Sequence, residues 1–389
     1  MTVHIVDPGG VFVRGHHLPL DRLLVDAAEA RGHAARVYWH RDVRRDALAL
    51  LDGTPAFSVS PYRFLHEHDR DPVAPLDVAG RHGRRFRDEL AEHVTPALAP
   101  GDTVVVHTIT TALLPGLLLW FREGGVAGVT LRLVLRYAAD GFTTGATAGM
   151  AAAVARYAFE ALAPADGLHL FADTPALAGH YETLSGRAVA VLPPPVAFVD
   201  DAGTAAAPTA PPVVGYLGGT RPDKGADILP DGLARLVERR PDVEVLAHMP
   251  GLRGDPPWPD TVLARTRLVR DPLDPAAFQR LMGGASLILL PYAPDAFAWR
   301  TSHILAEALG NARPVVTTPG TWMADELVRY GPVPGAVMAD YSGGALADAA
   351  AGLLDTLPAA LDAAARAAPH ARERHDGDRI AARLVGVDG

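Results

Sequence analysis

The chain has 389 residues, 49% of them hydrophobic, which is more apolar chain than one core usually holds. Two domains of roughly 150 to 200 residues are therefore expected. A formal net charge of -9 excludes the basic footprint of a nucleic-acid binder, so no nucleic acid is expected as a partner.

The sequence contains no cysteine, which excludes disulfides, thiolate catalysis and zinc sites built on sulfur. Residues 1–2 lead directly into an apolar run without the basic segment of a secretory signal, so a cytoplasmic location is expected. The longest apolar stretch, residues 112–121, contains Pro115 and Gly116 and is shorter than the roughly 20 residues of a membrane span. No transmembrane segment is expected.

One compositional bias singles out a residue. Of the 36 basic residues only Lys224 is a lysine, and all the others are arginines. A compact ammonium on a flexible stem enters sites where a planar guanidinium does not fit. Lys224 is therefore a candidate functional residue.

Short β-branched or leucine-rich runs alternate with helical patterns along the chain, which is typical of parallel sheets with crossover helices. The fold class expected is α/β, with two Rossmann-like domains that face each other across a cleft. Strands are expected at residues 3–6, 35–39, 103–107, 131–135, 168–171 and 188–192, and then at 213–217, 243–247, 267–269, 287–291, 315–317 and 336–338. Helices are expected at residues 18–31, 226–240 and 301–309 among others.

The pattern breaks at residues 193–212, which hold six prolines and six alanines and indicate an interdomain linker. We therefore expect a first domain at residues 1–196, a linker at 197–211, a second domain at 212–368 and a helical tail at 369–389. An alternative for the last helix is that it crosses back to the first domain.

Two candidate ligand-binding features follow strands of the first half. Gly9 and Gly10 follow the first strand, where a ligand can approach the backbone closely, although their spacing is not a dinucleotide fingerprint. His107 ends the third predicted strand at the same sheet edge. A bare turn and a structural histidine are the alternatives that the residues leave open.

In the second half, the strand at 213–217 runs into Gly218, Gly219, Arg221 and Lys224 before a helix begins. Two cations beside a helix start form an anion site, because free amides and the helix dipole favour phosphate. A loop with solvated charges is the alternative.

Near the start of the helix at 301–309, Arg300, His303 and Glu307 are spaced three and four residues apart and share one stripe. The Glu307 carboxylate can accept from two vicinal hydroxyls, such as those of a ribose. A surface salt bridge between Arg300 and Glu307 is the alternative.

Two groups of arginines are expected on solvated faces, with an anionic acceptor or peripheral contact with a membrane surface as the alternative. They are Arg41, Arg44 and Arg45, and Arg81, Arg84, Arg85 and Arg87.

At these residues the sequence resembles the retaining GT-B glycosyltransferases of glycosyltransferase family 4, best over residues 213–328. In that family an arginine and a Lys-Gly pair after a glycine-rich turn hold the donor diphosphate, and Arg221, Lys224 and Gly225 occupy the matching places. The family's later motif carries two acidic residues around a glycine-rich loop, and its latter part is matched by Glu307, Ala308, Gly310 and residues 314–316. The resemblance implies that Glu307, at the second acidic position, holds the ribose. The resemblance also implies that His107 contacts the transferred sugar.

Gly9 and Gly10 correspond to the family's loop beneath the donor. The first acidic position of the later motif departs from the family, because Asp295 leaves eleven residues before Glu307, more than the family spacing, and Trp299 stands at the spaced position. Asp295 and Phe297 are therefore kept as candidate sugar contacts. Arg300, Thr301 and Ser302 are candidate donor-binding residues of a substitute loop.

The resemblance implies transfer, with retention, of a sugar from a nucleotide diphosphate sugar to a hydroxyl acceptor, which is a small molecule, natural product, lipid or glycan. The donor is a co-substrate, and neither a cofactor nor a metal is expected. Arg221 and Lys224 would neutralise the leaving diphosphate, with His107 as the third catalytic residue.

Three other functions stay as alternatives. A catalytically silent nucleotide-binding or scaffold protein is motivated by the altered acidic position, and a nucleotide-sugar epimerase would use the same fold. An NAD-dependent dehydrogenase ranks last because neither glycine turn carries the fingerprint.

Overall fold

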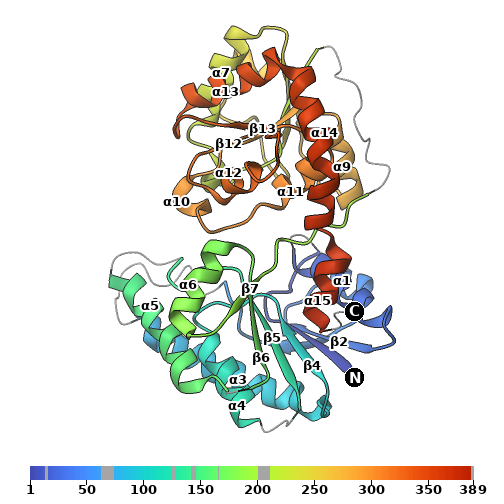
Figure 1. Cartoon of the computed structure of the whole chain (residues 1–389), viewed down its shortest axis with the longest axis vertical. Helices are drawn as coiled ribbons and strands as arrows, with labels where there is room; N and C mark the ends of the chain where they lie inside the picture. The colour runs from blue at the N-terminus through green and yellow to red at the C-terminus, as the bar shows by residue number, and fades with distance from the viewer. Residues whose placement is uncertain are drawn as a thin grey trace. The chain divides into compact units, whose positions relative to one another are not determined.

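The computed structural model describes residues 1–13, 16–62, 74–124, 128–141, 146–164, 166–199 and 211–386. The chain forms two compact units, the first from Met1–Pro195 with Gly377–Gly389 and the second from Val196–Asp376. The linker predicted at 197–211 lies mostly outside the described residues. Each unit is a twisted parallel sheet covered by helices (Figure 1).

The first unit contains a parallel sheet of seven strands in the order β3-β2-β1-β4-β5-β6-β7. The strands are β1 (Thr2–Asp7), β2 (Ala34–His40), β3 (Thr54–Phe57), β4 (Thr103–Val106), β5 (Thr130–Leu135), β6 (Leu168–Ala172) and β7 (Val189–Val191). The direction of winding reverses between β1 and β4, which pair directly. Open α/β sheets bind ligands outside the carboxyl ends of the strands at such a switch point.

Helices cover both faces of this sheet. On one face, Leu24 of α1 and Leu384 of α15 join Ile5 of β1 in one core; on the other, Phe86 and Leu117 pack with the even-numbered side of β4. The helices are α1 (His17–Glu29), α2 (Arg45–Leu50), α3 (Ala74–His93), α4 (Leu114–Glu123), α5 (Ala146–Tyr157), α6 (Pro175–Ser185) and α15 (Gly377–Val385). The last helix of the chain, α15, thus completes the first unit by packing along α1 (Figure 1).

The second unit contains a parallel sheet of six strands in the order β10-β9-β8-β11-β12-β13. They are β8 (Val213–Tyr216), β9 (Glu244–His248), β10 (Thr266–Val269), β11 (Leu287–Leu290), β12 (Val315–Thr317) and β13 (Gly335–Val337). Its switch point lies between β8 and β11, which pair directly.

The helices of the second unit also lie on both faces, so that two cores flank the sheet. Leu233 of α7 and Leu346 of α13 belong to one core, whereas Leu305 of α11 and Ala371 of α14 belong to the other. The helices are α7 (Leu229–Arg239), α8 (Asp260–Leu263), α9 (Pro275–Gly283), α10 (Pro294–Phe297), α11 (His303–Gly310), α12 (Trp322–Leu327), α13 (Gly343–Asp355) and α14 (Leu357–Arg374).

The predicted α/β class with two Rossmann-like halves is confirmed. One strand, β3, was not predicted from the sequence. It is a four-residue edge strand that contains Pro55, and both its shortness and its proline weaken the local strand signal.

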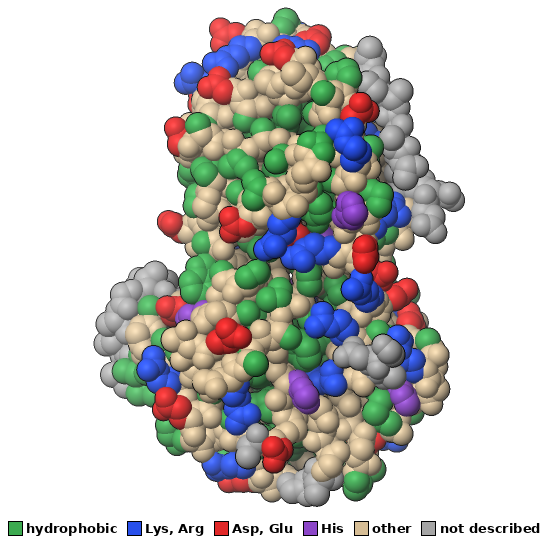
Figure 2. Space-filling model, in the orientation of Figure 1, with side chains coloured by type: hydrophobic (Ala, Val, Ile, Leu, Met, Phe, Trp, Pro, Cys, Tyr) green, Lys and Arg blue, Asp and Glu red, His purple; other side chains and the backbone are tan. Residues whose placement is uncertain are grey.

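The arginine groups mostly have acidic partners on the same surface. On α3, Arg81 lies 2.8 Å from Asp77 and Arg85 lies 2.9 Å from Glu89. Acidic and basic side chains are interspersed over the face seen in Figure 2. Of the described residues, no helix is both long and apolar enough to cross a membrane.

Candidate functional site

The loop after β8 and the loop after β11 lie together at the switch point of the second unit. The backbone N–H of Ala293 donates to the carbonyl of Asp223 over 3.0 Å. Gly225 adopts a φ of 86°, a conformation that favours glycine. These contacts bring Arg221 and Lys224 to the carboxyl edge of β8 and β11.

Asp223 holds two arginines at this edge. Its carboxylate accepts from Nε of Arg221 at 3.0 Å and from Nη1 of Arg300 at 2.9 Å. Arg300 also lies over the ring of Phe297, 4.6 Å from its centroid. The structure therefore pairs Arg300 with Asp223. The surface salt bridge between Arg300 and Glu307, which was the alternative considered from the sequence, is not formed in the part of the chain that the structure describes.

Lys224 contributes a third cation. Its Nζ lies 5.1 Å from the centroid of the Tyr292 ring, and no described residue forms a hydrogen bond or ion pair with it. Burial, followed by repulsion from Arg221, lowers the pKa of Lys224 to about 8. The ammonium group is thus held in place beside an aromatic face and keeps its hydrogen-bonding capacity for a ligand.

Tyr216 at the end of β8 supports the loop that carries these cations. Its hydroxyl donates to the carbonyl of Gly219 at 3.0 Å, and lies 3.3 Å from that of Lys224. A side chain on Gly218 would collide with the Tyr216 ring, while Gly219 adopts a φ of 74°. The two glycines therefore let the chain fold over Tyr216.

Glu307 lies on α11, which begins at the same edge because it follows β11. Ser302 caps this helix, and its hydroxyl accepts from the N–H of Leu305 at 3.4 Å. Glu307 is half-buried, and its carboxyl group has no partner among the described residues. Burial raises the pKa of Glu307 to about 8. A buried carboxyl group without a protein partner is suited to a ligand that brings hydroxyl groups.

The candidate sugar contacts occupy α10. Phe297 is buried, with its ring 4.6 Å from that of Tyr292, and so forms the floor under Arg300. Asp295 is exposed. Thr301 follows Arg300 and leads into the Ser302 cap.

The switch point of the first unit gathers the other predicted residues. The N–H of Gly9 donates to Oδ1 of Asp7 at 3.0 Å, and that of Gly10 to the Asp7 carbonyl at 3.3 Å. A side chain on Gly9 would collide with the ring of His17. Both glycines are therefore needed where the chain turns around Asp7.

His107 lies inside the first unit, and its side chain has no exposed surface. Its Nε2 lies 2.8 Å from Oδ1 of Asp21, and its Nδ1 lies 3.1 Å from the hydroxyl of Thr108. Burial lowers the pKa of His107 to about 4. Both ring nitrogens thus have protein partners in this structure.

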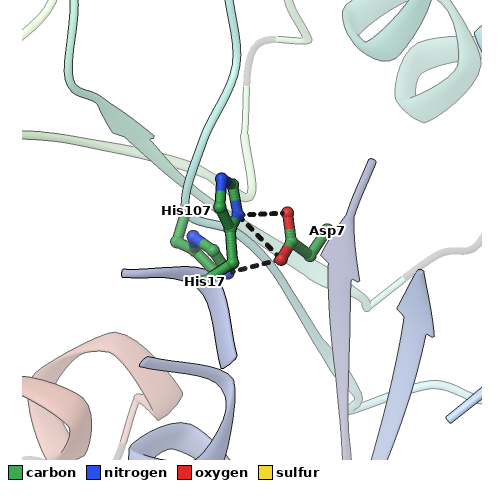
Figure 3. Close-up of side chains that lie close together, drawn as sticks. All are labelled: Asp7, His17 and His107. Carbon is green, nitrogen blue, oxygen red and sulfur yellow. Dashed lines mark hydrogen bonds and ion pairs between the residues drawn. The ribbon is translucent and has the colours of Figure 1, made fainter. Parts of the chain in front are cut away.

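Asp7 and His17 were not assigned a role from the sequence, yet the structure places them beside His107 (Figure 3). Nδ1 of His17 lies 2.8 and 2.9 Å from the two carboxylate oxygens of Asp7, and Nε2 of His107 lies 3.7 Å from Oδ2. Although burial alone would raise the pKa of Asp7, the two imidazoles lower it below its ordinary value. Burial and the charge of Asp7 raise the pKa of Asp21 well above its ordinary value.

Two Rossmann-like halves of this topology form the GT-B fold, and solved glycosyltransferases match the whole chain. HepE of Anabaena in complex with UDP-glucose matches with a TM-score of 0.62 at 16% identity, over 99% of this chain and 98% of that chain. WaaG, a glycosyltransferase involved in lipopolysaccharide biosynthesis, gives 0.63 at 18% identity over 99% and 100%. Sucrose-phosphate synthase from Thermosynechococcus elongatus gives 0.65 at 12% identity over 99% and 97%. No protein-family model matches the chain, and no curated protein matches it in sequence.

Proposed function

We propose that the protein is a glycosyltransferase that moves a sugar from a nucleotide diphosphate sugar to a hydroxyl acceptor. The observation that carries the proposal is the group of three cations at the β8–β11 edge, Arg221, Lys224 and Arg300, of which Lys224 has no ion-pair partner among the described residues. UDP-glucose is bound in the HepE structure, which has the same fold. A nucleotide diphosphate is therefore the ligand class proposed for this edge.

The three cations supply the electrostatics that the reaction needs. The bond between the anomeric carbon and the diphosphate oxygen breaks, a bond to the acceptor oxygen forms, and the acceptor proton leaves with the departing phosphate. Negative charge grows on the diphosphate in this step, and fixed cations stabilise it without reorganising. The start of α11 adds a partial positive charge at the same edge. Because these groups balance the diphosphate, the transfer needs no metal at this edge.

Glu307 is proposed to accept from the ribose hydroxyls, since its carboxyl group is half-buried and without a protein partner. Retention of the anomeric configuration is proposed only because the motifs that contain Arg221, Lys224 and Glu307 resemble those of retaining glycosyltransferases. We leave His107 out of the transfer site, because its side chain is fully enclosed in the first unit. Gly9 and Gly10 are still proposed to let the backbone approach the donor closely.

A second candidate function is a nucleotide-binding protein without transfer activity. It is favoured by α10, where Phe297 is buried in the core and Asp295 is the remaining acidic side chain before Glu307. Donor turnover separates the two candidates. A transferase forms free nucleotide diphosphate in the presence of acceptor, whereas a silent protein binds the donor and leaves it intact.

The proposal is tested by thermal unfolding with UDP, GDP, ADP and dTDP, each with and without a chelator. A nucleotide at a hundred times its dissociation constant should add about 2.7 kcal/mol of stability. Arg235→Ala is the control variant and should keep the stabilisation by nucleotide. This exposed arginine pairs with Asp231 on α7, outside the loops after β8 and β11. Stabilisation that disappears with the chelator, or no stabilisation by any of the four, contradicts the metal-free diphosphate site.

A further inference from the structure

We propose that the first unit binds one divalent transition-metal ion through Asp7, His17 and His107, with water in the remaining coordination position. This site goes beyond the proposed transfer reaction, because it belongs to the switch point of β1 and β4 and its role is to join β1, β4 and the start of α1.

The ligand atoms already have the spacing of a metal site. One ligand atom from each of Asp7, His17 and His107 lies within 4.8 Å of the others (Figure 3). In a tetrahedral site with metal–ligand distances of about 2.1 Å, neighbouring ligands are about 3.4 Å apart. Oδ2 of Asp7 lies 2.9 Å from Nδ1 of His17 and 3.7 Å from Nε2 of His107, on either side of that value.

Asp21 is a second buried carboxylate next to the His107 imidazole, outside the group of three ligands. Its Oδ1 lies 2.8 Å from Nε2 of His107. Two carboxylates and two neutral imidazoles balance the charge of a divalent ion. Since Asp7 and Asp21 both have no exposed surface, this neutralisation removes the cost of holding two carboxylates inside the protein.

Outer contacts orient every member of the set. The hydroxyl of Thr108 lies 3.1 Å from Nδ1 of His107, which directs Nε2 of that ring towards the ion. The hydroxyl of Tyr62 lies 2.8 Å from Nε2 of His17, which leaves Nδ1 for the ion. The N–H of Gly9 donates to Oδ1 of Asp7 at 3.0 Å, which leaves Oδ2 of Asp7 for the ion. Partners of this kind fix the tautomer and ring orientation of metal ligands.

The donor set selects the kind of ion. Imidazole nitrogens suit zinc, cobalt, nickel and copper, whereas magnesium and calcium prefer sites made of oxygen alone. Two imidazoles, one carboxylate and a water match a tetrahedral Zn²⁺ or Co²⁺ site. An ion enters past His17, the one member of the group with any exposed side-chain surface.

The test uses the full-length chain without an affinity tag, stripped of metal and dialysed against Zn²⁺ or Co²⁺ at micromolar concentration. We expect about one ion per chain and the intense visible absorption of tetrahedral Co²⁺. His17→Gln should weaken binding beyond the roughly 10- to 100-fold that removal of an outer partner costs. Thermal unfolding of the first unit should shift to higher temperature with metal.

His4→Gln is the matched control. His4 is a buried imidazole on β1 with Asp102 at 3.3 Å, outside the group of Asp7, His17 and His107, and its loss should leave metal binding unchanged. If His17→Gln does not fold, X-ray absorption of the zinc-loaded wild type decides instead, with two imidazoles expected. Wild type that binds no ion, equal binding by His17→Gln, or a zinc shell without two imidazoles overturns the site and leaves a hydrogen-bonded cluster. None of these readouts depends on glycosyl transfer.

Discussion

Gly225 faces the carbonyl oxygen of Pro291 so closely that a side chain on Gly225 would overlap it. This approach joins the loop after β8 to the end of β11, and Ala293 reinforces it by donating to Asp223. The cations of the candidate donor site are thus placed by a backbone contact that only glycine permits.

Gly225→Ala should therefore disturb both folding and donor binding. Its φ of 86° and the overlap with Pro291 together predict a loss of about 2 to 4 kcal/mol in the free energy of unfolding. Gly219→Ala is the control, because Gly219 shares a positive φ but has open space where its Cβ would lie. It should lose only about 1 kcal/mol. Equal losses in chemical denaturation would show that the Pro291 contact does not constrain the loop.

Lys224→Arg keeps the charge and changes only its shape and hydration. We expect turnover to fall at least about tenfold, or about 1.4 kcal/mol of transition-state stabilisation, because a guanidinium does not fit beside Tyr292 in place of the ammonium. Lys224→Ala should lose about 10² to 10³ in rate while the protein remains folded. Steady-state kinetics with circular dichroism check both. Full activity in Lys224→Arg would leave the diphosphate assignment to Arg221 and Arg300.

In Glu307→Gln, the affinity for a nucleotide diphosphate should decrease as the pH rises through about 8. Lys224, whose pKa is about 8, loses its positive charge in this range, which should cost up to about tenfold in affinity per pH unit. In the wild type the decrease should be smaller, because Glu307, whose pKa is also about 8, ionises in the same range and becomes the better acceptor for the ribose hydroxyls. Calorimetric titrations between pH 6.5 and about 9.5 measure the dependence, and a flat profile in Glu307→Gln would contradict it.

Glu307→Gln should weaken nucleotide binding and stabilise the free protein at the same time. The amide does not accept from both ribose hydroxyls, which costs about 1 to 3 kcal/mol of binding free energy. The raised pKa of Glu307 means that its ionisation opposes folding above the ordinary carboxyl range, so removing the ionisable group should add up to about 5 kcal/mol to the free energy of unfolding at pH 8.5. Gln279→Glu is not a matched control for this variant, because the Gln279 amide donates to the carbonyl of Ala197. Unchanged nucleotide affinity would instead assign Glu307 to the sugar or acceptor.

The sequence predicts those parts of the site that depend on local pattern. Strand and helix periods are recognised within a few residues, so the switch-point loops could be located, and the single lysine marked the candidate anion site. The role of Asp223 was not predicted, because its second partner, Arg300, is 77 residues away in the chain. Such a pairing depends on the order of strands in the sheet.

The group of Asp7, His17 and His107 illustrates the same limit. Gly9 and His107 were placed at one sheet edge, since both follow parallel strands. Asp7 follows the strand predicted at residues 3–6 and His17 precedes the helix predicted at residues 18–31, and neither was given a role. Only the pairing of β1 with β4 brings residues a hundred positions apart into one cluster.

Glu326 on α12 should make the second unit sensitive to acid. Its enclosed carboxylate accepts from Arg374, at 3.1 Å to Nη2, and lies 3.0 Å from Nε of Arg329; His375 and the Tyr330 hydroxyl also face it. Burial would raise the pKa of Glu326, but His375 and Arg374 hold it at about 2. Because the folded pKa lies below the unfolded one, this stabilisation is complete above about pH 4.5 and is lost as the pH falls towards 2.

Glu326→Gln should therefore lower the free energy of unfolding by about 2 to 3 kcal/mol at pH 7 and by much less near pH 2. The difference arises because the wild-type carboxylate is ionised and paired at neutral pH and becomes protonated in acid. Asp348→Asn, which removes an exposed partner of Arg239, is the control and should change stability by less than about 1 kcal/mol at either pH. Urea denaturation of the three proteins at both pH values makes the comparison. A loss in Glu326→Gln that is equally large at pH 2 would mean that packing between α12 and α14, and not the charge of Glu326, holds the two helices together.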